Sequence, residues 1–352
     1  MRIRVVAVVA LSILGVAAAA LPAAAHEGWG VVSRNGTVYV ADIPANVIWR
    51  IGSDGAEVVA RGIHSHALAI GPDGAVYGTD VEPGGSGSGR VWRVDLEGRF
   101  ETVVPAGGAG GMGLQSFLVG PDGAIYSASA FQADRAPGSR TLHLLRRRAD
   151  GTLDTLAGGL VGWRDGTGAA ARFSAIDGMA WLADGSLVVV DGARLRRVDL
   201  AGNVRTLTPP LSRPRWGEDL LGVAVGLGDT LIAADFAGRV LRRWHAGKAL
   251  APLDRGWYWA PAGVASSEGM MFVLEHPRAP FGILGDLGVG PYLSVRAFGT
   301  GGPPWIMARL WGRNTDIAVA AVVCILALMA VPLVRRRRAR RRTAGNAEVG
   351  AA

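Results

Sequence analysis

The chain has 352 residues and a formal net charge of +8, and 49% of its residues are hydrophobic. The first 25 residues carry +2 and residues 335–352 carry +6, so residues 26–316 form a neutral body. A neutral body lacks the one-sided basic patch that a phosphate backbone requires, which argues against nucleic-acid binding. The single cysteine excludes both an intramolecular disulfide framework and a cysteine-based zinc site.

Residues 1–25 are expected to be a signal peptide. Arg2 and Arg4 precede an apolar stretch that Pro22 breaks, and residues 23–25 are the small alanines that signal peptidase requires. The alternative is an N-terminal membrane anchor that is not cleaved. The short apolar core and its small-residue end favour cleavage, which would place a mature chain beginning at His26 outside the cytoplasm.

The body contains six copies of one pattern. Each copy has an apolar strand, a tight turn with glycine, a second apolar strand, a polar loop and a third strand. The first two strands are expected within residues 31–42, 68–80, 117–129, 179–191, 223–235 and 264–276. The third strands are expected at 47–51, 91–95, 142–146, 194–198, 239–243 and 293–297, and most copies add a fourth short strand. The spacing suits four-strand units joined by loops of variable length.

This repetition predicts an all-β fold, a six-bladed β-propeller over residues 26–302. A hairpin of two apolar strands cannot bury both of its faces alone. Radial stacking of similar sheets buries both faces of every blade and leaves only short edges. A parallel βαβ architecture is excluded because no stretch of helical period separates the strands. The regular sixfold self-similarity also excludes an immunoglobulin-type sandwich.

Two segments resemble known propeller families. Residues 162–207 (GWRDGTGAAARFSAIDGMAWLADGSLVVVDGARLRRVDLAGNVRTL) look like a bacterial NHL repeat, including the G-x-x-D-G-x-G…A-x-F loop before it. The opening is similar to the gluconolactonase/regucalcin family, because Glu27 stands 15 residues before Asp42 in YVADIP. Together the two resemblances cover residues 27–298, and both imply the same six-bladed fold.

The residue before each innermost strand is expected at one mouth of the central channel. These residues are Glu27, His66, Gln115, Asp177, Leu221 and Ala262. The gluconolactonase resemblance implies a ring of Glu, Asn and Asp that holds a divalent metal, with a further Asn on the substrate side. Glu27 matches the Glu, Asp177 replaces the metal-binding Asn, and Gln115 replaces the substrate-side Asn. We therefore expect Glu27, His66, Gln115 and Asp177 to bind a ligand at this mouth.

The residues of this ring do not identify which metal ion would bind. Leu221 stands where the family has its Asp, and Ca²⁺ or Mg²⁺ requires several oxygen ligands. Asp177 restores one negative charge, and His66 adds a nitrogen that suits Zn²⁺ or Mn²⁺. Glu27, Asp177 and His66 are thus the candidate ligands of one divalent metal, at a site that is either damaged or rewritten.

Two other groups of residues have competing interpretations. His64 and His66 have the spacing at which two histidines on a strand chelate one metal, but a polar loop with one hydrogen-bonded and one solvated histidine is the favoured interpretation. The acids that close the second strands could form a catalytic set, but their recurrence in nearly every copy favours hydrogen bonds to turns or arginines. These acids are Asp42, Asp80, Asp191, Asp235 and Glu275.

The C-terminal part predicts a single membrane span. Residues 303–316 are expected to be a juxtamembrane linker, and residues 317–334 form an uncharged stretch long enough for a transmembrane helix. Residues 335–352 form an arginine-rich tail, which the positive-inside rule places in the cytoplasm and the propeller outside. A sorting signal that is later removed is the alternative, but no recognisable cleavage motif precedes the span.

Two functions follow, and the residues leave open whether the chain is an enzyme. The favoured function is a membrane-anchored, extracytoplasmic NHL-like propeller that binds a small-molecule or protein ligand. The alternative is a metal-dependent lactone or ester hydrolase resembling gluconolactonase, in which metal-bound water attacks the carbonyl. A strictosidine-synthase-like propeller is a third possibility that rests on fold analogy alone.

Overall fold

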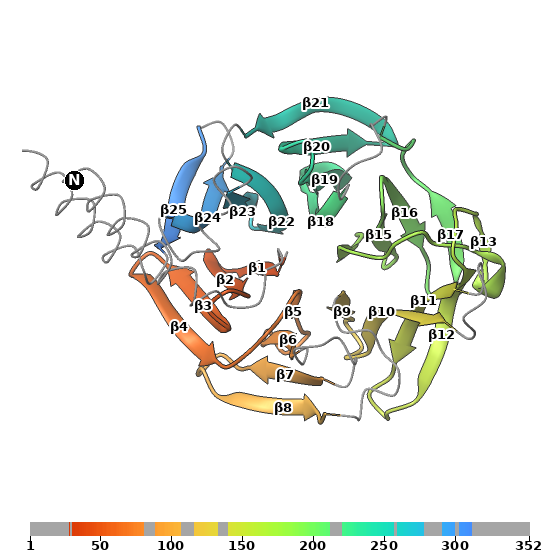
Figure 1. Cartoon of the computed structure of the whole chain (residues 1–352), viewed down its shortest axis with the longest axis horizontal. Coiled ribbons are helices and arrows are strands. Elements are labelled where there is room, and N and C mark those ends of the chain that lie inside the picture. Colours follow the sequence, from red (N-terminus) through yellow and green to blue (C-terminus); the bar gives the residue numbers. More distant parts are fainter. Residues whose placement is uncertain are drawn as a thin grey trace, which may run out of the picture. The chain divides into compact units, whose positions relative to one another are not determined.

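The computed structural model describes residues 28, 30–80, 89–106, 116–132, 140–211, 220–256, 259–277, 291–299 and 303–311. These residues form six antiparallel sheets arranged around one axis (Figure 1). The prediction of an all-β six-bladed propeller is therefore confirmed. The compact unit that contains the blades spans residues 22–282 and 293–310. A second unit comprises residues 1–21, 283–292 and 311–352, almost all of which lie outside the described residues.

Each blade is built from consecutive strands, with the first strand nearest the axis. Blade 1 contains β1 (Val31–Arg34), β2 (Thr37–Asp42), β3 (Val47–Gly52) and β4 (Gly55–Arg61). Blade 2 contains β5 (Leu68–Ile70), β6 (Val76–Asp80), β7 (Arg90–Val94) and β8 (Phe100–Val104). Blade 3 contains β9 (Phe117–Val119), β10 (Ile125–Gln132), β11 (Arg140–Arg147) and β12 (Leu153–Leu160).

The other three blades repeat this order with one addition. Blade 4 contains β14 (Met179–Trp181), β15 (Leu187–Asp191), β16 (Arg194–Val198) and β17 (Asn203–Thr206), and β13 (Gly166–Thr167) pairs with β17 as a fifth strand. Blade 5 contains β18 (Leu220–Gly226), β19 (Thr230–Asp235), β20 (Val240–His245) and β21 (Lys248–Arg255). Blade 6 contains β22 (Trp259–Ser267), β23 (Met270–Pro277), β24 (Pro291–Phe298) and β25 (Trp305–Trp311). Two short 3₁₀ turns, η1 (Gly168–Ala170) and η2 (Leu227–Asp229), lie beside blades 4 and 5.

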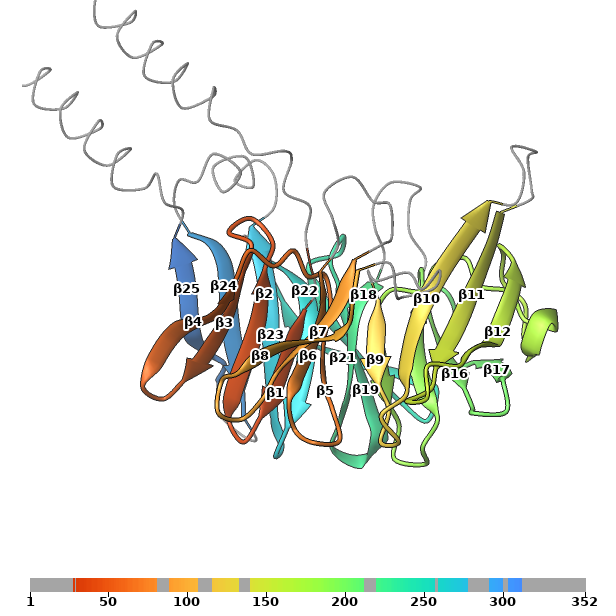
Figure 2. The ribbon, with the colours of Figure 1, turned by 90° about the horizontal axis from the view of Figure 1, so that it is seen from below.

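The turn between the first two strands of each blade has the backbone that its sequence predicts. The turn glycines at 36, 74, 123, 185 and 269 all have φ between +73° and +78°. In blade 5 the turn is different, because Gly228 and Asp229 adopt φ of +62° and +56°. Glycine at a positive φ avoids the strain that a side chain would cause, and such turns match the twist of a hairpin. The turns therefore lie together on one face of the propeller, which we call the hairpin face (Figure 2).

The hydrophobic core lies between neighbouring blades, as radial stacking requires. Between blades 3 and 4, for example, Tyr126 and Leu144 pack with Phe173 and Val189. In β15 all five side chains are buried, since blade 4 is covered on both of its faces. Similar clusters fill the spaces between blades 1 and 2, 2 and 3, 4 and 5, and 5 and 6. This packing holds the innermost strands in fixed positions around the axis.

The C-terminal end of the described chain differs from the expected linker. Residues 305–311, which we assigned to a juxtamembrane segment, form β25 and complete blade 6. An outermost strand pairs along one edge only and is half exposed, so its sequence does not need the apolar pattern of an inner strand. Trp305 and Ile306 accordingly remain exposed.

The predicted membrane segments lie outside the described residues. The signal peptide, the span at 317–334 and the arginine-rich tail are all among them. Within the part of the chain that the structure describes, none of the helices has the length and apolar character that crossing a bilayer requires. The membrane topology therefore stays a prediction.

Candidate functional site

A small cavity lies on the propeller axis, where the innermost strands of all six blades meet. Its volume is about 40 Å³. Its lining consists of Val31, Ala67, Leu68, Ser116, Phe117, Asp177, Gly178, Met179, Gly222, Val223 and Val264. Polar atoms make up most of the wall, and its two polar side chains belong to Ser116 and Asp177. A space of this size holds about two or three water molecules, so a larger ligand must remain mostly at the mouth.

Glycines bring blades 4, 5 and 6 unusually close together beside this cavity. A Cβ on Gly178 would lie 2.4 Å from the carbonyl oxygen of Leu221, and one on Gly222 would lie 2.8 Å from Cα of Gly263. The amide of Gly178 donates to the same carbonyl of Leu221 at 2.8 Å. Because any side chain would clash, glycine follows the ring position in each of these three blades. This signal, Gly after Asp177, Leu221 and Ala262, is visible in the sequence and was missed there.

Asp177 is held at the cavity wall by its own backbone. Its amide donates to the carbonyl oxygen of Val190 at 3.2 Å. Its carbonyl oxygen accepts a hydrogen bond from the hydroxyl of Ser116, which is buried in blade 3. The backbone of this half-buried residue is thus fixed between two blades, on the lining of the cavity.

His66 belongs to a rigid loop before blade 2. Its ring is buried, and its Nε2 lies 3.3 Å from Nε2 of His64. The Asp80 carboxylate accepts from the amide of His64 at 3.1 Å, and the Ser65 hydroxyl donates to the carbonyl oxygen of Ala67 at 3.0 Å. Two imidazole nitrogens on one tetrahedral Zn²⁺ would lie about 3.3 Å apart, from Zn–N bonds of about 2.0–2.1 Å. The spacing of the two histidines therefore fits two ligands of one metal ion.

A third histidine joins the ends of the ring. Nε2 of His276, which is buried at the end of β23, lies 3.1 Å from the carbonyl oxygen of Gly28. A carbonyl can only accept, so this nitrogen carries the proton. The bond ties blade 6 to the residue that follows Glu27. The sequence analysis missed this role because nothing in the local pattern pairs two residues so far apart in the chain.

Only some of the predicted ring residues are among the residues that the structure describes. Glu27 and Gln115 lie outside the described residues, Asp177 lines the cavity, and His66 faces His64. Leu221 and Ala262 are buried and offer no side-chain ligand atom. Among the described residues, no three His, Cys, Asp or Glu side chains gather as a metal site would require. The described donors alone therefore do not complete a divalent metal site, since Ca²⁺ and Mg²⁺ take six or more oxygens and Zn²⁺ takes three or four protein ligands, of which His64 and His66 would supply two.

Comparison with solved structures gives the same architecture. A streptogramin B lyase superimposes with a TM-score of 0.51 and 14% identity over 84% of this chain and 87% of that one. A gluconolactonase from Xanthomonas campestris gives 0.51 and 16% over 70% and 83%, and a luciferin-regenerating enzyme gives 0.52 and 14% over 71% and 83%. The chain shares their six-bladed propeller fold. No family model and no curated protein matches the sequence.

The resemblance to gluconolactonase-like propellers is thus confirmed at the level of the fold. One fold carries many functions, so the activities of these three proteins do not follow for this chain. Its function has to be inferred from the residues at the channel mouth and between the blades.

The recurring acids of this propeller are structural, as expected. Each accepts hydrogen bonds from a turn amide, a tryptophan or an arginine of its own blade; these acids are Asp42, Asp80, Asp191, Asp235 and Glu275. The fully buried Arg196 binds Asp191 at 2.5 Å and Asp165 at 2.8 Å. Burial raises the pKa of Glu275, although Arg296 opposes this shift. These carboxylates hold the blades and are not available for catalysis.

Proposed function

We propose that the chain is a membrane-anchored, extracytoplasmic propeller that binds a small polar molecule at the mouth of its channel. The observation that carries the proposal is the position of Asp177, a half-buried acid on the lining of a mostly polar cavity where six blades meet. A cavity of about 40 Å³ admits a hydroxyl or an ammonium group while the rest of the ligand stays at the mouth. Such a donor group would pair with the carboxylate of Asp177 in a strong, charge-assisted hydrogen bond.

The binding test uses the full-length protein in a nonionic detergent. Sugars, polyols and primary amines are screened by thermal shift, and each hit is titrated by calorimetry. Asp177→Asn should lower the affinity for each hit at least about tenfold, because a charge-assisted hydrogen bond is lost. The control Asp150→Asn changes an exposed turn acid of blade 3 and should leave the affinity unchanged. A panel without a hit, or equal affinity in both variants, contradicts the proposal.

The membrane anchor is supported by the uncharged stretch at 317–334 and by the arginines that follow it. Removing residues 317–352 should release the protein from the membrane fraction of cells that produce it. A truncated chain that still sediments with membranes after alkaline extraction contradicts the anchor. Protease treatment of intact cells should digest the propeller and spare an epitope placed after residue 342.

A second candidate function is the metal-dependent hydrolysis of a lactone or ester. It is favoured by the 3.3 Å spacing between the Nε2 atoms of His64 and His66 and by the fold shared with a gluconolactonase. Metal analysis of the purified protein, together with a panel of lactones, separates it from simple binding. Stoichiometric metal and a turnover that Glu27→Ala and Asp177→Ala both abolish would replace the first proposal with this one.

A further inference from the structure

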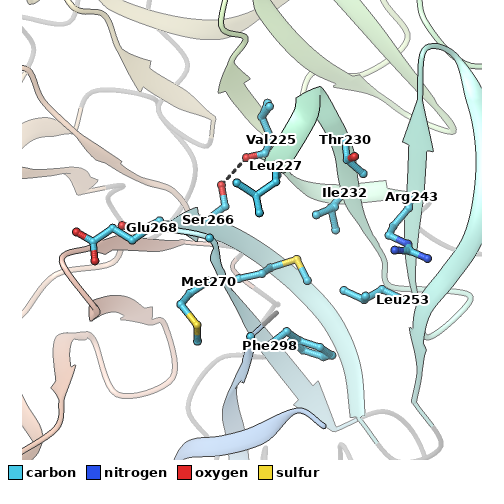
Figure 3. Close-up of a pocket in the computed structure, with 15 residues that line it drawn as sticks. Val225, Leu227, Thr230, Ile232, Arg243, Leu253, Ser266, Glu268, Met270 and Phe298 are labelled. Atoms are coloured by element: carbon cyan, nitrogen blue, oxygen red, sulfur yellow. Dashed lines mark hydrogen bonds between the residues drawn. The ribbon is translucent and has the colours of Figure 1, made fainter. Parts of the chain in front are cut away.

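A second concave site lies between blades 5 and 6 on the hairpin face, away from the axial cavity. This groove has a volume of about 430 Å³, within the range of about 300–1,000 Å³ that is usual for small-molecule sites. Most of its lining is apolar, with Leu227, Ile232, Leu253, Met270 and Phe298 around the space (Figure 3). We call it the blade 5–6 groove.

One end of the blade 5–6 groove carries a cation. Arg243 of β20 lies at that end, whereas the side chain of Glu268, in the turn before β23, points away from the groove (Figure 3). The hydroxyl of Ser266 donates to the carbonyl oxygen of Val225 at 2.6 Å and links the two blades. The groove therefore combines an apolar middle with a guanidinium at one end.

The repeat itself shows what is unusual about Arg243. In blades 1, 2 and 3 the third strand has an arginine directly opposite an acid of the fourth strand. These ion pairs are Arg50–Glu57, Arg93–Glu101 and Arg146–Asp154. In blade 4 the corresponding arginine, Arg197, binds the turn acid Asp184 at 2.6 Å instead.

Blade 5 keeps the arginine and lacks the acid. The residue opposite Arg243 on β21 is Leu250, and no acid among the described residues lies within ion-pair distance of its guanidinium. Its Nε donates to the carbonyl oxygen of Ala251 at 3.0 Å, which occupies one of five N–H groups. A guanidinium beside an apolar surface, with donors left over, presents a fork that matches a carboxylate.

We propose that the blade 5–6 groove binds a free amphipathic monocarboxylate. Its carboxylate lies on Arg243, and its apolar part lies against Ile232, Met270 and Phe298. Methionine adapts to apolar groups of different shape, so a flexible alkyl or aryl chain fits this lining. This site is independent of the ligand proposed at Asp177.

The test titrates octanoate into the full-length protein by calorimetry, with the same detergent without protein as the blank. Octanamide has the same chain without the charge, and acetate has the charge without the chain. Octanoate should bind at least about tenfold more tightly than octanamide, because the ionised pair is missing in the amide. Acetate should not bind measurably. Absent octanoate binding, or equal affinity for octanoate and octanamide, overturns the proposal.

Two variants locate the site. Arg243→Gln should lower the affinity for octanoate at least about tenfold and leave the affinity for octanamide unchanged. Leu250→Glu should lower the affinity for octanoate by a similar factor. The substitution places an acid opposite Arg243, as blades 1 and 2 have opposite their arginines. Leu250 is 42% exposed and lies outside the lining, so this substitution leaves the apolar surface intact.

The matched control is Arg50→Gln, which removes the equivalent arginine of blade 1 and should leave octanoate binding unchanged. Circular dichroism and thermal unfolding confirm that each variant is folded. Octanoate affinity that is equal in wild type, Arg243→Gln and Leu250→Glu overturns the assignment to this groove. Asp177→Asn should not change the octanoate affinity, so this test is separate from the test of the channel mouth.

Discussion

The groove between blades 1 and 2 and the groove between blades 5 and 6 occupy equivalent places in the repeat. Their volumes are about 410 and 430 Å³. Thr37 in the first corresponds to Thr230 in the second, and Arg50 corresponds to Arg243, since each arginine faces the third residue of the preceding strand. The propeller therefore provides two spaces of nearly equal size with an arginine in the same position.

The chemistry of the two grooves is opposite. In the blade 1–2 groove Arg50 binds Glu57, and Asp95 and Glu97 add further acids to the lining. In the blade 5–6 groove the lining is mostly apolar, and Leu250 faces Arg243. The comparison teaches that the fold fixes the place of the cation, while one residue of the fourth strand decides whether the chain neutralises it.

The largest expected effect comes from an arginine–acid pair that is truly buried. In blade 4 the side chains of Asp191 and Arg196 are both fully buried. Asp191→Ala should lower the free energy of unfolding by about 3–5 kcal/mol, because it leaves Arg196 as a poorly compensated buried charge. Urea unfolding followed by tryptophan fluorescence measures this loss. A loss below about 1 kcal/mol would contradict the account, because the buried pair would then contribute no more stability than an exposed pair in a groove.

The next prediction tests whether a single substitution is enough to make the blade 1–2 groove bind octanoate. Glu57→Leu makes the residue opposite Arg50 resemble the one opposite Arg243. Because polar and charged residues such as Arg34, Asn35 and Asp95 remain in the lining, the blade 1–2 groove should still lack the apolar surface that an alkyl chain requires. Total octanoate binding should then change by less than about threefold, since a difference of that size is under about 1 kcal/mol. A second binding equivalent in the calorimetric isotherm would show that the opposing residue alone is decisive.

A smaller effect is expected on stability from the exposed pair itself. The side chains of Arg50 and Glu57 are 40% and 59% exposed. Glu57→Gln should therefore cost no more than about 1 kcal/mol of unfolding free energy. If urea unfolding shows a loss comparable to that of Asp191→Ala, the pair stabilises blade 1 and does not merely set the charge of the groove.

The smallest effect is a dependence on pH in blade 3. The hydrogen bond from Arg146 lowers the pKa of Asp154. A lowered pKa in the folded state means that the stability contribution is present above the unfolded pKa and is lost as pH falls through the folded value. Asp154→Asn should flatten the acid limb of the curve of unfolding free energy against pH. Parallel curves for wild type and variant below the ordinary Asp range would contradict the assignment.

The sequence predicted the elements that local chemistry determines. Turn glycines such as Gly36 and Gly185 need a positive φ, and the apolar alternation around them specifies strands, so six blades could be counted. The acids that close the second strands could be recognised as structural because they recur. Asp177 could be placed at the channel because every innermost strand begins there.

The rest depended on register and on distant packing. Which fourth-strand residue faces an arginine depends on turn length and on β-bulges, which shift the pairing at Ile48/Trp49 and at Leu241/Arg243. A one-residue slip would place a different side chain opposite Arg243, so the lack of an acid there could not be seen in the sequence. The bond from His276 to Gly28 likewise joins two residues that are 248 positions apart in the sequence.

A crystal structure of the full-length protein with octanoate tests the central claim most directly. The account predicts the carboxylate within hydrogen-bonding distance of the guanidinium of Arg243, the alkyl chain along Met270, and no octanoate at Arg50. Octanoate bound beside Arg50, or bound to neither arginine at a concentration that saturates calorimetry, would contradict it.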